Sequence, residues 1–153
     1  MLVSFAAYAM VALSGLASAD PGSSMEPDHL ILGNKEYAVE LALDNESRRQ
    51  GLSGRSALPE GHAMVFVWPD SAPRRFHMGG MQFAIDIVFL DSDGAVLNVA
   101  TEVPPCASDP CPRYYSEGPA SVVVEIPAGA AAREGLTPGT LVSLPASWSA
   151  EAR

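Results

Sequence analysis

Two carboxyl groups stand in strand-like stretches whose other side chains are almost all apolar. Asp86 lies in residues 83–90, where both faces of a period-two alternation are apolar, and Glu125 lies in residues 121–126. An unpaired carboxylate in a buried strand is costly, so each acid needs a partner or a cavity. If they share one pocket, they can serve as general acid and general base, because unequal surroundings separate their pKa values.

Two arginines, Arg48 and Arg55, flank a glycine turn at Gly51. An arginine presents a bidentate fork, so this pair can bind a carboxylate or phosphate ligand. The alternative is that they tie a short helix and the following loop to Asp86 or Glu125. We favour the second interpretation, because acids in apolar strands need cations. Both hold if the four side chains form one polar cluster that lines a pocket.

Imidazole and thioether groups gather at His77, Met78 and Met81, around Gly79–Gly80. These soft ligands select Cu(I) in an oxidising compartment. His77 and Met78 point to opposite faces of an ordinary strand, so both can bind one ion only where the glycines break the strand. We favour the competing interpretation, in which these three side chains fill core and turn positions. We therefore expect no cofactor.

The stretches that must position these side chains are mostly strands. Residues 83–90, the turn Asp91-Ser92-Asp93-Gly94 and the apolar residues 95–100 predict a β-hairpin. The pattern predicts a mainly β fold, α+β at the margin, that is compact and closed or nearly closed, with about seven or eight short strands and one or two short helices. Further strands are expected at 30–32, 37–43, 64–68, 121–126 and 140–144, and helical turns at 46–50 and 130–134.

The ends of the chain differ in composition from its middle. Residues 1–19 carry no charged side chain and close with Ala17-Ser18-Ala19, which predicts a signal peptide and a periplasmic or secreted protein. No Lys or Arg precedes the apolar stretch, so an uncleaved anchor is the alternative. We expect a flexible leader at 20–28, a single globular domain at 29–145 and a flexible tail at 146–153.

The cysteines, Cys106 and Cys111, lie in a proline-rich loop. In an exported protein such a pair is expected to form a disulfide. Zinc is the competing interpretation, but it would need a second pair of ligands nearby.

The charge balance argues against one class of partner. The chain has 18 acidic and 9 basic side chains, a net charge of −9, with the basic residues scattered. A nucleic-acid binder needs a basic face, so we expect no nucleic-acid partner. No segment after residue 19 is long and apolar enough to span a membrane. We also expect the protein to be a monomer.

Several short motifs together resemble a known family. They are Glu46-x-Arg48 with Gly51-Leu52, Met64-Val65-Phe66, Phe76 to Met81, Ile85-Asp86-Ile87 with Asp93-Gly94, and Val124-Glu125 with Pro127-Ala128-Gly129. Over residues 36–144 the chain resembles the bacterial and archaeal family called domain of unknown function number 192. The resemblance implies a compact, mostly β, often exported domain without an established activity. His77 and Gly79 stand where the family usually has Trp and Lys.

The sequence therefore favours a secreted or periplasmic binding module for a small ligand or another envelope protein. One alternative is an enzyme that uses Asp86 and Glu125 as an acid–base pair. A second alternative is a Cu(I)-handling protein that uses His77, Met78 and Met81.

Overall fold

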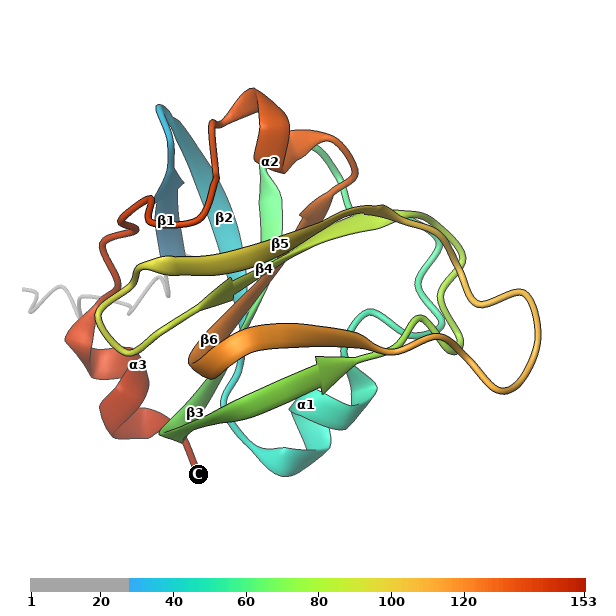
Figure 1. Ribbon diagram of the computed structural model, residues 1–153, viewed down its shortest axis with the longest axis horizontal. Helices are drawn as coiled ribbons and strands as arrows, with labels where there is room; N and C mark the ends of the chain where they lie inside the picture. Colours follow the sequence, from blue (N-terminus) through green and yellow to red (C-terminus); the bar gives the residue numbers. More distant parts are fainter. Residues whose placement is uncertain (1–27) are drawn as a thin grey trace, which may run out of the picture.

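The computed structural model describes residues 28–153 as one six-stranded sheet with three short helices. The strand order is β1-β2-β3-β6-β4-β5 (Figure 1), and every neighbouring pair is antiparallel except β2 and β3. The expected signal peptide and nearly all of the leader lie outside the described residues. The elements are β1 (Asp28–Leu32), β2 (Lys35–Ala42), α1 (Asn45–Gln50), β3 (His62–Phe76), β4 (Ile85–Leu90), β5 (Val96–Val103), β6 (Tyr114–Pro127), α2 (Ala130–Arg133) and α3 (Ala146–Glu151).

The core lies on both faces of the sheet, and β6 runs through its middle. One apolar cluster contains Val65, Val124 and Ile126, together with residues from α2 and α3. The other contains Phe66, Ile87 and further side chains on the opposite face. Because both faces are covered, β4 and the second half of β6 are buried along their whole length. The predicted mainly β class is confirmed.

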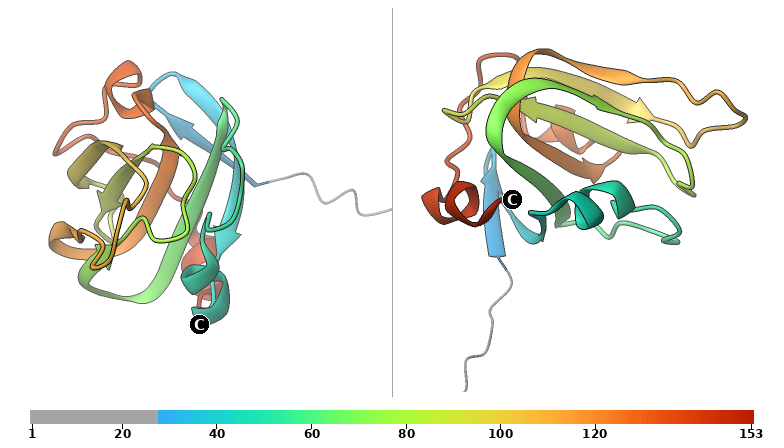
Figure 2. Two further views of the ribbon diagram at one scale, coloured as in Figure 1. Left: turned by 90° about the vertical axis from the view of Figure 1, so that its right-hand side faces the viewer. Right: turned by 90° about the horizontal axis from the view of Figure 1, so that it is seen from below.

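The sheet is not closed, so the expected closure is wrong. Residues 28–153 form six strands, fewer than the predicted seven or eight, and β1 and β5 lie at the two edges of an open sheet. Pro69 and Pro73 would ordinarily end a strand, since proline cannot donate to a ladder. Instead β3 continues through both prolines for 15 residues and bends strongly (Figure 2). Its pairing with β6 shifts register between Val67 and Ala72, around Pro69, and again between Pro73 and Arg75.

The last predicted strand, residues 140–144, is reduced to one isolated bridge between Leu141 and Ala95. The expected tail also differs from the structure, because α3 occupies most of it. Trp148 of α3 is buried, and its Nε1 donates to Asp28 Oδ1 at 3.4 Å. A single buried tryptophan in a short segment gives no helical periodicity, so the sequence carried no signal for α3.

The predicted hairpin turn is present, and short-range hydrogen bonds stabilise both this turn and the start of α1. The β4–β5 hairpin turns at residues 91–94, where the Asp91 carboxylate accepts from the N–H groups of Asp93 and Ala95, both at 2.9 Å. Asp44 caps α1 by accepting from the N–H groups of Glu46 and Ser47 at 2.9 and 2.8 Å.

The loop between β5 and β6 contains the expected disulfide, with Cys106 Sγ 2.14 Å from Cys111 Sγ. The Cys106 N–H also donates to the Met78 carbonyl at 3.2 Å. This loop is therefore fixed to the segment that follows β3. No helix among residues 28–153 has the length and apolarity required to cross a membrane.

Asp86 is fully buried, as the alternation around it predicted, but its partners are not arginines. Its Oδ1 accepts from the Glu102 N–H at 2.7 Å, and its Oδ2 accepts from the Ala131 N–H at 2.9 Å. Glu102 has a positive φ of 49° at an irregular point of the β4–β5 ladder. The carboxylate thus joins that point of β5 to the first turn of α2.

Asp86→Ala is expected to lower the free energy of unfolding by about 2–4 kcal/mol, because two amide donors lose their acceptors. Denaturant unfolding at neutral pH measures this loss. Asp86→Asn keeps one acceptor oxygen and should lose less. Asp93→Ala, an exposed control, should change stability by less than about 0.5 kcal/mol. Equal stability of Asp86→Ala and the control would contradict this structural role.

Candidate functional site

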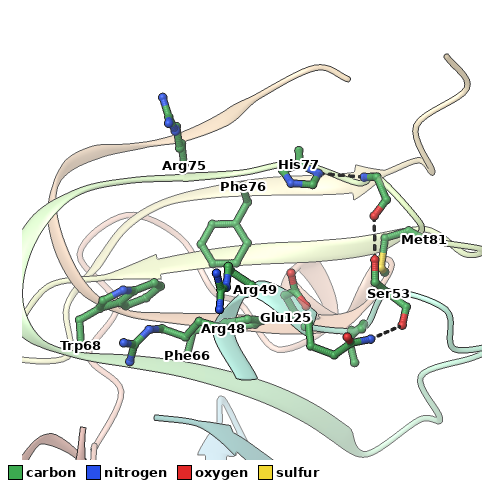
Figure 3. Close-up of a pocket in the computed structure, with 14 residues that line it drawn as sticks. Arg48, Arg49, Ser53, Phe66, Trp68, Arg75, Phe76, His77, Met81 and Glu125 are labelled. Carbon is green, nitrogen blue, oxygen red and sulfur yellow. Dashed lines mark hydrogen bonds between the residues drawn. The ribbon is translucent and has the colours of Figure 1, made fainter. Parts of the chain in front are cut away.

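A cavity of about 230 Å³ lies between α1, the bent strand β3 and the segment that follows it. We call it the Glu125 cavity, after the residue that β6 contributes to its wall (Figure 3). Among the other residues that line it are Arg48, Arg49, Ser53, Phe66, Trp68, Phe76, His77 and Met81.

The carboxyl group of Glu125 is the unusual feature of this cavity. The residue is 6% exposed, and its Oε2 is the single buried side-chain oxygen or nitrogen without a hydrogen-bond partner in residues 28–153. Burial raises the pKa of Glu125 to about 8, although the Arg55 charge opposes the rise. The carboxyl is therefore mostly protonated and uncharged at neutral pH.

Strand pairing explains why this acid is buried. Glu125 lies opposite Met64 of β3 and Ile87 of β4, so apolar side chains flank it on both sides. Because β6 is a central strand, its side chains have access to water only where the covering layer leaves a gap. The Glu125 cavity is that gap.

Arg55 acts on Glu125 from a distance and does not pair with it. Its guanidinium makes a two-pronged ion pair with Glu40 of β2, with nitrogen–oxygen distances of 2.7 and 2.6 Å. The hydrogen bonds from Arg55 also lower the pKa of Glu40. The expected tie between Arg55 and one of the two strand acids is therefore wrong, because the exposed Glu40 takes both prongs.

Arginines of α1 form one side of the cavity. Arg48 donates to the Val67 carbonyl at 2.7 Å and to Asn45 Oδ1 at 2.9 Å, and its guanidinium carbon lies 5.4 Å from the Trp68 ring centre. Burial lowers the pKa of Arg48. The exposed Arg49 uses only its Nε within the described chain, donating to the Asn45 carbonyl at 3.2 Å. Of the two arginines of α1, Arg49 is therefore the one whose terminal N–H groups make no hydrogen bond in residues 28–153.

Aromatic rings of β3 form the apolar wall. The Phe66 and Phe76 rings meet edge to face with centres 5.0 Å apart, and Phe76 meets Phe89 of β4 at 5.9 Å. The period of two along β3 places Phe66 and Trp68 on the face that carries Glu125. The wall is rigid because each ring contacts another.

The segment after β3 closes the cavity through backbone contacts. The Ser53 hydroxyl donates to the Gly79 carbonyl at 2.8 Å, and the Gly54 N–H donates to the Gly80 carbonyl at 2.9 Å. Gly80 has a φ of 76°, which a residue with a side chain adopts only with strain. Figure 3 shows Ser53 linked to this segment beside Met81.

The structure separates the two acids that were considered as a catalytic pair. In the pairing of β4 with β6, Asp86 lies directly opposite Ile126, and the next residue of β4, Ile87, lies opposite Glu125. Directly opposite residues share a face, and successive residues alternate, so the two carboxyl groups lie on opposite faces of the sheet. They cannot exchange protons with one substrate. Of the predicted polar cluster, Arg48 and Glu125 reach the same cavity.

The three candidate copper ligands also occupy different surroundings. Met78 is buried in the core, His77 is exposed and Met81 is half-buried. His77 Nδ1 accepts from the Gly79 N–H at 3.0 Å, and His77 and Met81 line the cavity whereas Met78 does not. The expectation of no cofactor and the alternative of Cu(I) binding both stay untested.

Sequence reasoning missed several lining residues. Arg49, Ser53, Phe66 and Trp68 were not predicted as site residues, although Phe66 and Trp68 lie on the Glu125 face of β3. The usable signal was the Arg48–Arg49 pair at the end of a short helix, together with an aromatic alternation next to a strand that carries an acid.

The family model described as Uncharacterized ACR matches residues 29–144, more than half of the chain. The chain belongs to the DUF192 family. This family is uncharacterised, so membership confirms the resemblance and assigns no activity. No curated protein matches the chain significantly.

Two solved structures resemble this DUF192 chain. A putative transcription regulator from Sinorhizobium meliloti 1021 shares 29% identity at a TM-score of 0.67, over 75% of this chain and 89% of that one. A protein of unknown function from Novosphingobium aromaticivorans DSM 12444 shares 24% identity at a TM-score of 0.69, over 91% of this chain and 100% of that one. The second likeness shows the fold alone.

The raised pKa of Glu125 predicts an unusual pH dependence of stability. Between its ordinary value of 4.5 and about 8, the folded chain holds a proton that the unfolded chain has lost. The free energy of unfolding should therefore fall as pH rises through this window, by roughly 3–5 kcal/mol from this group. Urea unfolding at a series of pH values measures the slope. Glu125→Gln should flatten it, and Glu117→Gln, an exposed control, should not. A wild-type slope that Glu125→Gln leaves unchanged would contradict the assignment.

Proposed function

We propose that this protein binds a small organic molecule in the Glu125 cavity, and that the protonated carboxyl of Glu125 donates a hydrogen bond to it. The observation that carries the proposal is the buried carboxyl of Glu125, which lines the cavity and whose Oε2 has no hydrogen-bond partner in residues 28–153. A buried polar atom without a partner costs free energy. A ligand that supplies an acceptor recovers that free energy on binding.

The surroundings of Glu125 support a ligand site over a defect in packing. Ligand sites combine apolar and aromatic walls with a few convergent polar groups, and they concentrate groups with perturbed pKa values. Here Phe66, Phe76 and Met81 supply the apolar surface, while Glu125 and Arg49 supply the polar groups. The volume of about 230 Å³ lies below the range of about 300–1,000 Å³ for drug-sized ligands, so it suits a smaller molecule.

Other functions have less support in the structure. The Sinorhizobium protein is named as a transcription regulator, but the net charge of −9 on this chain disfavours contact with a phosphate backbone. We propose export to the periplasm or the medium on the pattern in residues 1–19 alone. An exported protein would bind its ligand outside the cytoplasm.

A fragment screen by NMR tests the function directly. We expect small aromatic fragments to shift the resonances of Glu125, Phe66 and the Met81 methyl group. Glu125→Gln, whose amide also donates, should retain binding. Glu125→Leu fills a similar volume without a donor and should weaken binding at least about tenfold.

Glu117→Gln is the matched surface control and should bind as the wild type does. Spectra of each variant outside the cavity verify its fold. If Glu125→Leu binds the fragments as tightly as the wild type, Glu125 is not the donor and the proposed function is wrong.

A further inference from the structure

The charges around the Glu125 cavity narrow the ligand to one class. Resting on the function proposed above, we propose that the ligand is a small organic anion with a flat apolar body. Its body lies against Phe66, Phe76 and Met81, and its negative group is held by Arg49 of α1 and accepts from the Glu125 carboxyl.

The lining is positively charged within an acidic protein. Arg48, Arg49 and Arg75 line the cavity, although the whole chain has only 9 Lys and Arg against 18 Asp and Glu. Glu125 is the one acidic side chain in that lining. Arg75 points away from the cavity in Figure 3, so α1 provides the nearer charge. A cavity lined by one sign of charge focuses the field and concentrates ligands of opposite sign.

The two arginines of α1 have separate roles. Both terminal nitrogens of Arg48 are already occupied, by the carbonyls of Val67 and Arg153 and by Asn45 Oδ1. Arg48 therefore contributes charge and fixes the Trp68 ring. In residues 28–153 the terminal nitrogens of Arg49 make no hydrogen bond, and a carboxylate fits that fork in a bidentate manner.

A cationic ligand is the opposing interpretation. An ammonium group favours a buried carboxylate and the faces of aromatic rings. Two observations argue against a cation. It would have to ionise Glu125 while lying beside Arg48 and Arg49. The Trp68 ring is also already occupied, because the guanidinium carbons of Arg48 and Arg74 lie 5.4 and 4.4 Å from its centre. The arrangement thus favours an anion.

Three compounds of the same shape and different charge test the ligand class: benzoate, benzamide and benzamidine, which are anionic, neutral and cationic at neutral pH. NMR titration of the full protein should give benzoate a dissociation constant at least about tenfold below that of benzamide, with no saturable binding of benzamidine. Arg49→Gln should raise the benzoate constant to the benzamide value and leave benzamide unchanged. Arg113→Gln, an exposed arginine outside the cavity, is the control and should change neither constant.

The outcomes separate the two proposals. If benzamide or benzamidine binds at the cavity at least as tightly as benzoate, the anion inference is overturned while the cavity remains a ligand site. If Arg49→Gln keeps the full preference for benzoate, Arg49 is not the anion-binding group and the inference is likewise overturned. If none of the three compounds shifts any cavity resonance, both the anion inference and the proposed function fail.

Discussion

The burial of one uncompensated carboxyl group, that of Glu125, is the constraint on which the site depends. The acid lies on the central strand β6 between Met64 and Ile87, where a charge would meet apolar neighbours on both sides. Protonation, which the pKa of about 8 permits at neutral pH, makes this burial tolerable. The covering layer of α1 and the loop after it then leaves a cavity over the acid.

The opposite face of the same sheet shows how a buried acid is treated when it serves only the fold. Asp86 is as deeply buried as Glu125, yet each of its oxygens accepts from a backbone amide, one from Glu102 and one from Ala131. Both oxygens of the Asp86 carboxylate are hydrogen-bonded, whereas in residues 28–153 Glu125 retains one oxygen without a partner. Both acids stand in apolar strand sequences, but they differ in whether every carboxyl oxygen has a hydrogen-bond partner, which is the property that a ligand can use.

Local chemistry made part of this structure predictable. The turn at residues 91–94, the cap at Asp44 and the burial of Asp86 follow from patterns of a few residues. What failed depends on distant partners: Asp86 is satisfied by amides 16 and 45 residues away, and β3 passes through Pro69 because a shift in register with β6 accommodates it. Of the four side chains expected to form one polar cluster, Arg48 and Glu125 line the cavity. The other lining residues were not predicted, because α1 and β3 meet through tertiary packing that no short motif encodes.

The central claim is that Glu125 is a neutral carboxylic acid in the wall of a ligand cavity. Carbon-13 NMR of the side-chain carboxyl, titrated from acid to alkaline pH in the full protein, measures its protonation directly. We expect a midpoint near the value of about 8, and a further rise when saturating benzoate is present, because a bound anion opposes ionisation. A midpoint near the ordinary glutamate value of 4.5, unmoved by benzoate, would contradict it.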